Sequence, residues 1–158
     1  MPLPMTRRDF LRSTSLALAA AGCATPATPA AADEGRILTV TGPIPAERLD
    51  RTLIHEHVVV DFIGAARTSP DRYDPEKAFE TALPHFRELR ARGIASLVEC
   101  TPRFIGRNPA LLRRLSEASG VQIVTNTGWY AAVDHKFLPG EAATATADRI
   151  ANLWLEDW

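Results

Sequence analysis

Residues 52–61 read Thr-Leu-Ile-His-Glu-His-Val-Val-Val-Asp, and this run is too apolar for a strand that has one face in water. Strands that are apolar on both faces are typical of parallel sheets, which are covered on both sides. The sequence therefore predicts a buried parallel strand over these ten residues.

Three more apolar runs along the chain have the length and composition of strands. Residues 94–100 and 121–127 resemble the first run and are the second and third predicted core strands. A shorter strand is expected at residues 37–41, where the turn signal Gly42-Pro43 should close it.

Helical patterns follow each of the three core strands. Asp74-Pro75 supplies an N-cap and a proline for the first turn of a helix that should stop at Gly93. Pro84 lies inside this helix and should kink or divide it, because proline lacks a backbone donor. Residues 108–120 predict a second helix, with an Asn-Pro start and a glycine stop, and a third helix is expected from Glu141 onward to the end of the sequence.

The alternation of strand and helix, repeated three times, predicts an α/β fold with right-handed crossovers between parallel strands. Periodicity alone fits both a (β/α)8 barrel and an open doubly wound sheet. The chain has 158 residues, which suits one domain of average size. A (β/α)8 barrel typically needs about 250 residues.

The composition excludes several classes of function. There are 18 basic and 19 acidic residues with a formal charge of −1, so no charge excess favours nucleic acid or an anionic membrane surface. Hydrophobic residues make up 46% and charged residues 23%, which excludes a wholly disordered chain.

Residues 1–22 have the pattern of a targeting segment. Arg7 and Arg8, followed by Phe10 and Leu11, resemble a Tat-type export signal, and the apolar run at 16–22 is shorter than the roughly 20 residues needed to span a bilayer. We therefore expect an exported protein, either periplasmic or anchored to a membrane.

The end of the signal has two alternative positions. Residues 20–23 resemble a lipobox, which makes Cys23 a candidate for lipidation, whereas Ala30-Ala31-Ala32 is a cleavage pattern that would release a periplasmic protein. Residues 23–34 are rich in proline and alanine and are expected to form a tether. Cys100 is then the remaining thiol and is expected to be a small buried apolar side chain.

The most informative chemical feature is His55-Glu56-His57 in the first core strand. Side chains alternate along a strand, so the two histidines share one face about 6.5 to 7 Å apart, while Glu56 points away. Two imidazoles at this spacing can hold one metal ion. The alternative is a pair of core histidines whose ring nitrogens are satisfied by hydrogen bonds.

Together with other segments in the same order, this motif resembles the phosphotriesterase family of the amidohydrolase superfamily. The resemblance runs from residue 36 to the end and departs from the family at Leu49-Asp50, where Leu-Gly is usual. The segments that carry it are residues 37–44, Leu49, 52–57, Asp61, 97–101, 105–107, the leucine-rich helix that follows, 121–124 and 127–130.

This resemblance implies that residues 35–158 are the first three βα units of a (β/α)8 TIM barrel, incomplete in this chain. His55 and His57 would bind the more buried ion of a binuclear centre, usually zinc. The other ligands of the family come from strands four, five, six and eight. Lys77, Lys136, His85 and His135 lie outside the strands and are not expected to be ligands.

Four further residues are candidates for the site. Trp129 and Tyr130, just beyond the third core strand, could bind substrate or pack at the rim of the site. Asp61 and Glu99, near the ends of the first two core strands, could orient the imidazoles or have a structural or capping role.

The leading hypothesis is the N-terminal fragment of an exported, zinc-dependent hydrolase of small phosphotriesters or lactones, with another ester or an amide as a third option. The runner-up is a noncatalytic truncated remnant with weak or no metal binding, tethered through Cys23 or free. Two imidazoles supply half of a four-coordinate zinc shell, so the fragment alone is expected to be inactive. No nucleic-acid partner is expected, and a homodimer is a candidate assembly for the full-length protein.

Overall fold

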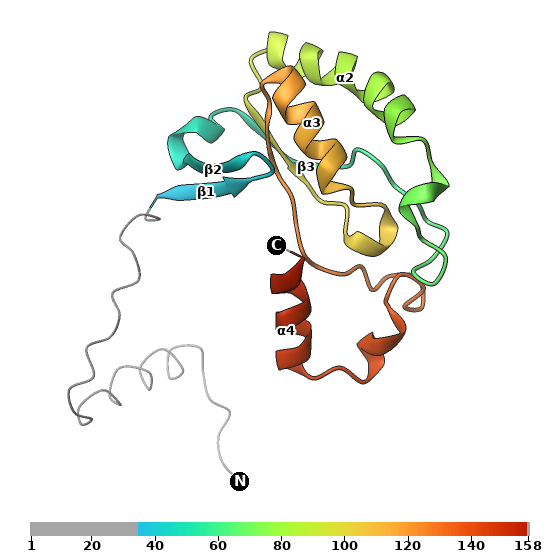
Figure 1. The fold of residues 1–158 in the computed structure, drawn as a ribbon. Helices are drawn as coiled ribbons and strands as arrows, with labels where there is room; N and C mark the ends of the chain where they lie inside the picture. Colours follow the sequence, from blue (N-terminus) through green and yellow to red (C-terminus); the bar gives the residue numbers. More distant parts are fainter. Residues whose placement is uncertain (1–34, 158) are drawn as a thin grey trace, which may run out of the picture. The chain divides into compact units, whose positions relative to one another are not determined.

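A three-stranded parallel sheet with the order β3-β4-β5 organises the structure, a computed structural model that describes residues 35–157 (Figure 1). The helices and strands, in chain order, are β1 (Arg36–Thr39), β2 (Gly42–Pro45), β3 (Thr52–Glu56), α2 (Pro75–Ala91), β4 (Ser96–Glu99), α3 (Pro109–Ser119), β5 (Gln122–Val124) and α4 (Ala147–Glu156). The predicted signal at 1–22, the lipidation candidate Cys23 and the tether at 23–34 lie outside the described residues.

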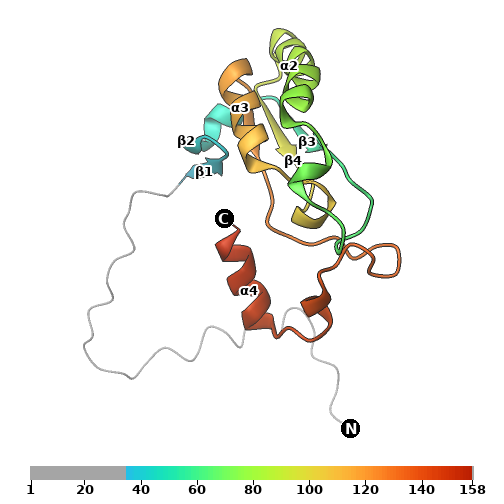
Figure 2. The ribbon, with the colours of Figure 1, turned by 45° about the vertical axis from the view of Figure 1, so that its right-hand side comes forward.

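The parallel pairing confirms the predicted α/β class. Thr52 and Leu53 of β3 lie opposite Ser96 and Leu97 of β4, and β4 pairs with β5 in the same direction. Figures 1 and 2 show α2 and α3 on the same side of this sheet, as right-handed crossovers require. The described strands form an open sheet rather than a closed barrel.

The prediction of a buried strand over residues 52–61 is wrong in two respects. The strand ends at Glu56, and Ile54 is 78% exposed. The reason is that β3 is an edge strand of the described sheet, so burial of its outward side chains depends on a neighbour that residues 35–157 do not supply. β4, the central strand, is buried as predicted.

Both helix starts and both glycine stops are confirmed. The Asp74 carboxylate accepts hydrogen bonds from the backbone N–H of Glu76 and Lys77 at the start of α2, and the Asn108 side chain caps α3 in the same way. Gly120 ends α3 with a φ of 74°, in the left-handed region that favours glycine. Pro84 does not divide α2: it is exposed, so water can replace the missing backbone donor on that side.

Several boundaries differ from the predicted ones, and the third core strand, Gln122–Val124, is shorter than the expected 121–127. Gly42-Pro43 does not close the first strand but begins β2, which pairs antiparallel with β1. Proline is tolerated there because β2 is an edge strand. Glu141 lies in a 3-10 helix, Gly140–Ala143, and α4 starts only at Ala147, where Thr146 is the N-cap. None of the helices within residues 35–157 has the length and apolar character needed to cross a bilayer.

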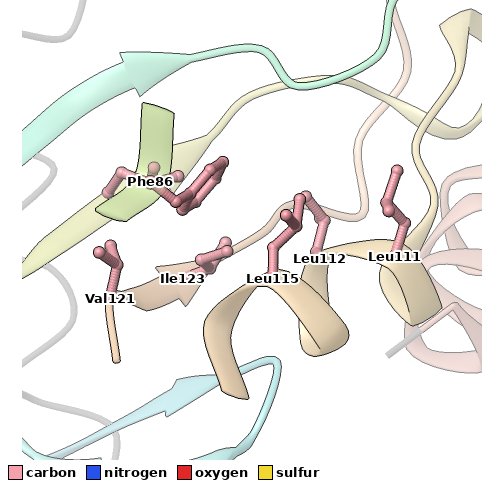
Figure 3. Packing of buried hydrophobic residues seen from close by; sticks show 7 residues of the cluster. Phe86, Leu111, Leu112, Leu115, Val121 and Ile123 are labelled. Atoms are coloured by element: carbon pink, nitrogen blue, oxygen red, sulfur yellow. The ribbon is translucent and has the colours of Figure 1, made fainter. Parts of the chain in front are cut away.

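The core lies between the sheet and the two helices that cover it (Figure 3). Leu115 from α3 and Ile123 from β5 are 0% exposed, and Phe86 from α2 is 5% exposed. The full cluster consists of Phe86, Leu97, Leu111, Leu112, Leu115, Val121 and Ile123. These side chains come from α2, β4, α3, β5 and the residue before β5, so the core anchors β4 beside β3.

Asp50, the second residue of the unusual Leu-Asp dipeptide, has a strained backbone conformation. Its φ of 47° and ψ of −137° lie in a region that glycine adopts readily and other residues rarely do. The turn nevertheless forms, and the Leu49 carbonyl accepts a hydrogen bond from the Ser96 hydroxyl at 2.6 Å.

Asp50→Gly is expected to raise the free energy of unfolding by about 1 kcal/mol, because it removes this strain. Urea denaturation followed by circular dichroism measures the change. Asp148→Gly is the matched control: it places glycine in the first turn of α4, where a loss of about 0.5 to 1 kcal/mol is expected. A loss of stability in both variants would contradict the strain at Asp50.

Candidate metal centre

The two histidines of the H-x-H motif lie together at the carboxyl end of β3. His55 is inside the strand, and His57 is the first residue after it. Their ring centroids are 5.2 Å apart and the rings meet edge to face, at an angle of 72°. Both side chains are exposed. Two ring nitrogens can therefore approach one point from the same side of the strand.

His57 is the first member of a hydrogen-bonded chain that leads into the sheet. Its Nδ1 lies 3.0 Å from the hydroxyl of Thr101, two residues past the end of β4. The Thr101 hydroxyl in turn donates a hydrogen bond to the carboxylate of Glu99. Thr101 is 0% exposed and Glu99 is 1% exposed, so this chain is shielded from solvent.

Glu99 accepts hydrogen bonds from three donors. Besides the Thr101 hydroxyl, these are the backbone N–H of Thr101 at 3.2 Å and the backbone N–H of Val58 at 3.3 Å. Burial raises the pKa of Glu99 above its ordinary value of 4.5, while these hydrogen bonds oppose the rise. The Val58 contact also ties the segment after β3 to the end of β4.

Asn126 holds the ends of β4 and β5 together. Its side-chain amide donates to the backbone carbonyls of Glu99 at 3.2 Å and Thr101 at 3.1 Å. Sequence reasoning missed Thr101 and Asn126. The signal that could have found them is their place at the carboxyl ends of neighbouring parallel strands, where polar side chains of a (β/α)8 fold gather.

The hydrogen bonds of Asp61 go to residues other than His55 and His57. Its carboxylate pairs with Arg72 and accepts from the Ile63 backbone N–H at 3.1 Å. Its backbone N–H donates to the Ile105 carbonyl at 2.8 Å. A Cβ at Gly106 would lie 3.0 Å from the Val59 carbonyl oxygen, so this glycine permits the close approach. These contacts fix the loop that follows the two histidines.

Trp129 and Tyr130 belong to two aromatic clusters beyond β5. The centroid of the Trp129 ring lies 6.2 Å from that of Phe104 and 6.1 Å from that of Trp154 on α4, and both pairs of rings pack edge to face. Tyr130 is 41% exposed and packs against Phe137 at 5.6 Å. The structure thus gives both rings packing partners, and their role in substrate binding stays a prediction.

Three further polar residues and Cys100 lie on α2, in the loop after β5 and directly after β4. Lys77 and His85 project from α2 into an open cleft of about 540 Å³, which His57 also lines. Lys136 donates to the Phe62 carbonyl in the loop after β5. Cys100 is half-buried, less than predicted, and lies directly after the end of β4, next to the Ile54 carbonyl.

Two imidazole donors fit half of a tetrahedral zinc shell. Within residues 35–157, no group of three or more histidine, cysteine, aspartate and glutamate side chains is close enough to hold a metal ion. Nδ1 of His57 faces the Thr101 hydroxyl, so Nε2 is the ring nitrogen that does not contact Thr101. His55 and His57 could therefore supply two of the four ligands of such a shell.

Comparisons with known proteins agree on one family. The sequence profile of the "Phosphotriesterase family" matches residues 35–157. A "Phosphotriesterase homology protein" of Mycobacterium tuberculosis is 34% identical over 100 residues, which are 63% of this chain and 31% of that protein. An "Aryldialkylphosphatase" of Saccharolobus solfataricus is 27% identical over 114 residues, 72% of this chain and 35% of the relative.

A solved structure is also similar to the chain in both fold and sequence. The "Organophosphorus Hydrolase from Deinococcus radiodurans" superposes with a TM-score of 0.54 at 42% sequence identity, over 61% of this chain and 29% of that protein. The chain thus spans about a third of the length of the relatives that it matches, 31% and 35% of the two curated proteins described above.

Proposed function

The chain belongs to the phosphotriesterase family, and from this premise we propose that it supplies the first three βα units of a metal-dependent hydrolase of small-molecule esters. In this proposal His55 and His57 hold a divalent metal ion, with zinc as the expected ion because it favours imidazole ligands. The complete barrel would provide the remaining ligands.

The observation that carries the proposal is the pair of imidazoles on one side of β3, 5.2 Å apart, at the carboxyl end of the sheet. Active sites of (β/α)8 barrels lie at this end of the strands. The His57 ring is also backed by Thr101 and Glu99, which is the arrangement that orients metal-bound histidines. A pair of incidental surface histidines would not need such support.

The substrate class follows from the family rather than from the geometry. A bound divalent ion supplies Lewis acidity and lowers the pKa of a bound water, which suits the hydrolysis of phosphotriesters and lactones. One matching relative, from Xenopus tropicalis, is named "N-acetyltaurine hydrolase", so an amide is a further candidate substrate. In this proposal Trp129 and Tyr130 form apolar walls beside the metal.

Export is a separate part of the proposal. The twin arginines of residues 1–22 support translocation, and Cys23 supports a lipid anchor as the alternative to release into the periplasm. Neither of them affects the chemistry proposed for the two histidines.

The test is a chimeric barrel. The segment of the Deinococcus radiodurans hydrolase that aligns with this chain is replaced by this chain's own residues, which are 42% identical to it. We expect zinc-dependent hydrolysis of a phosphotriester or a lactone by the chimera, and its loss in His55→Ala and in His57→Ala. His85→Ala, at an exposed position of α2 that is not expected to bind the metal ion, is the control that should keep the activity.

The noncatalytic alternative makes the opposite prediction. A folded chimera that binds no zinc and hydrolyses neither substrate would favour the remnant hypothesis. Hydrolysis that persists when both His55 and His57 are replaced would contradict the proposed metal site, because the activity would then come from other groups.

A further inference from the structure

The contact between His57 and Thr101 joins two residues that are 44 positions apart in the sequence. Nδ1 of His57 and Oγ1 of Thr101 are 3.0 Å apart, a normal hydrogen-bond distance. Distance alone leaves two arrangements open, because a neutral imidazole carries its proton on Nδ1 or on Nε2.

Glu99 decides between the two arrangements. The Thr101 hydroxyl has a single proton, and it is donated to the carboxylate of Glu99. The backbone N–H groups of Thr101 and Val58 also point at this carboxylate, so it is surrounded by donors and acts as the acceptor. With its proton committed to Glu99, the Thr101 oxygen can only accept a hydrogen bond from His57.

We propose that Thr101 is a positioning residue whose hydroxyl oxygen holds the imidazole proton of His57 on Nδ1 and so leaves Nε2 free to bind a divalent metal ion. This inference deepens the proposed function, because it depends on His57 being a metal ligand. It assigns to Thr101 the role that a carboxylate or a backbone carbonyl plays beside many metal-bound histidines.

Burial and hydrogen bonds hold Thr101 in place, so its hydroxyl can orient the His57 ring. Thr101 and Glu99 are 0% and 1% exposed, so water does not compete for their hydrogen bonds. The side-chain amide of Asn126 holds both backbone carbonyls from the neighbouring strand end. The ring of His57 is therefore oriented by groups that belong to the buried centre of the sheet, although the ring itself is exposed.

The first experiment reads the tautomer without metal. The chain is labelled with 15N-histidine, sedimented, and measured by magic-angle-spinning NMR about two pH units above the ordinary imidazole pKa of about 6.5. Magic-angle-spinning NMR does not require rapid tumbling, so association through the open sheet edges does not prevent the measurement. His57→Gln identifies the His57 signals by difference.

We expect His57 of the unsubstituted chain to carry its proton on Nδ1. Thr101→Val, which removes the hydroxyl and keeps the shape, should shift His57 toward the Nε2–H tautomer, while Thr101→Ser should keep the original one. Thr125→Val is the matched control, because the Thr125 hydroxyl is buried without a hydrogen-bond partner among the described residues. A proton on Nε2 of His57 in the unsubstituted chain would overturn the inference even if Thr101→Val fails to fold.

The second measurement is the zinc affinity of the chimeric barrel, by isothermal titration. Thr101→Val is expected to weaken zinc binding about 10-fold or more, while Thr125→Val leaves it unchanged. Equal affinities in these two variants would overturn the positioning role. If His55→Ala and His57→Ala also bind zinc as well as the unsubstituted chimera does, then the proposed metal site fails. The NMR result on its own reports whether Thr101 sets the tautomer.

Discussion

Leu115→Ala is expected to lower the free energy of unfolding by about 3 to 5 kcal/mol, a large fraction of the total stability of a typical domain. Leu115 is 0% exposed and lies where α3 meets α2 and the sheet. Its removal leaves a cavity in a cluster of only seven buried side chains, which has little capacity to repack. Urea denaturation monitored by circular dichroism measures the effect.

Leu155→Ala is the matched control for this substitution. Leu155 lies on α4 and is 71% exposed, so its truncation should change the free energy of unfolding by no more than about 0.5 kcal/mol. Equal effects of the two substitutions would contradict the location of the core between the sheet and the helices α2 and α3.

Glu99→Ala should be the second large loss, of about 3 kcal/mol. The variant deprives three donors of their acceptor: the hydroxyl and N–H of Thr101 and the N–H of Val58. Each buried donor left without a partner costs about 1 to 3 kcal/mol. Glu80→Ala, an exposed position on α2, is the control and should be nearly neutral.

The pH dependence of stability gives an independent check on Glu99. Because burial raises the folded-state pKa of Glu99 above 4.5, the folded chain binds this proton more tightly than the unfolded chain does. The stability that the chain gains from this tighter binding of the Glu99 proton is fully present below pH 4.5. It is lost as the pH rises through the folded-state pKa. The urea midpoint of the unsubstituted chain should therefore fall as the pH rises from 4.5 through the folded-state pKa of Glu99, and Glu99→Gln should lack this fall. The same pH profile in both proteins would contradict the raised pKa of Glu99.

The parts of the fold that local physics controls were predictable from the sequence. The starts of α2 and α3 followed from an N-cap and a proline, and their ends from glycine, because these residues satisfy or terminate the helix backbone wherever they occur. The burial of β3 was not predictable, since it depends on what lies beside an edge strand. Pro84 was misjudged because solvent exposure, which determines its cost, is a tertiary property.

The candidate site shows the same division. The placement of His55 and His57 on one face followed from the two-residue period of a strand. The Thr101 hydroxyl between His57 and Glu99 could not be predicted, because a threonine after a strand has many ordinary roles and this contact spans 44 positions of sequence. Asp50 is intermediate: its departure from the family pattern marked the turn, and the positive φ gave the physical reason.

The central claim is that His55 and His57 form half of a metal centre that a complete barrel fills. Zinc content of the purified chimera, measured by inductively coupled plasma mass spectrometry after dialysis, tests it most directly. We predict that His55→Ala and His57→Ala each lose bound zinc relative to the unsubstituted chimera, while His85→Ala retains it. A zinc content that is the same in all four proteins, each shown to be folded, would contradict the account.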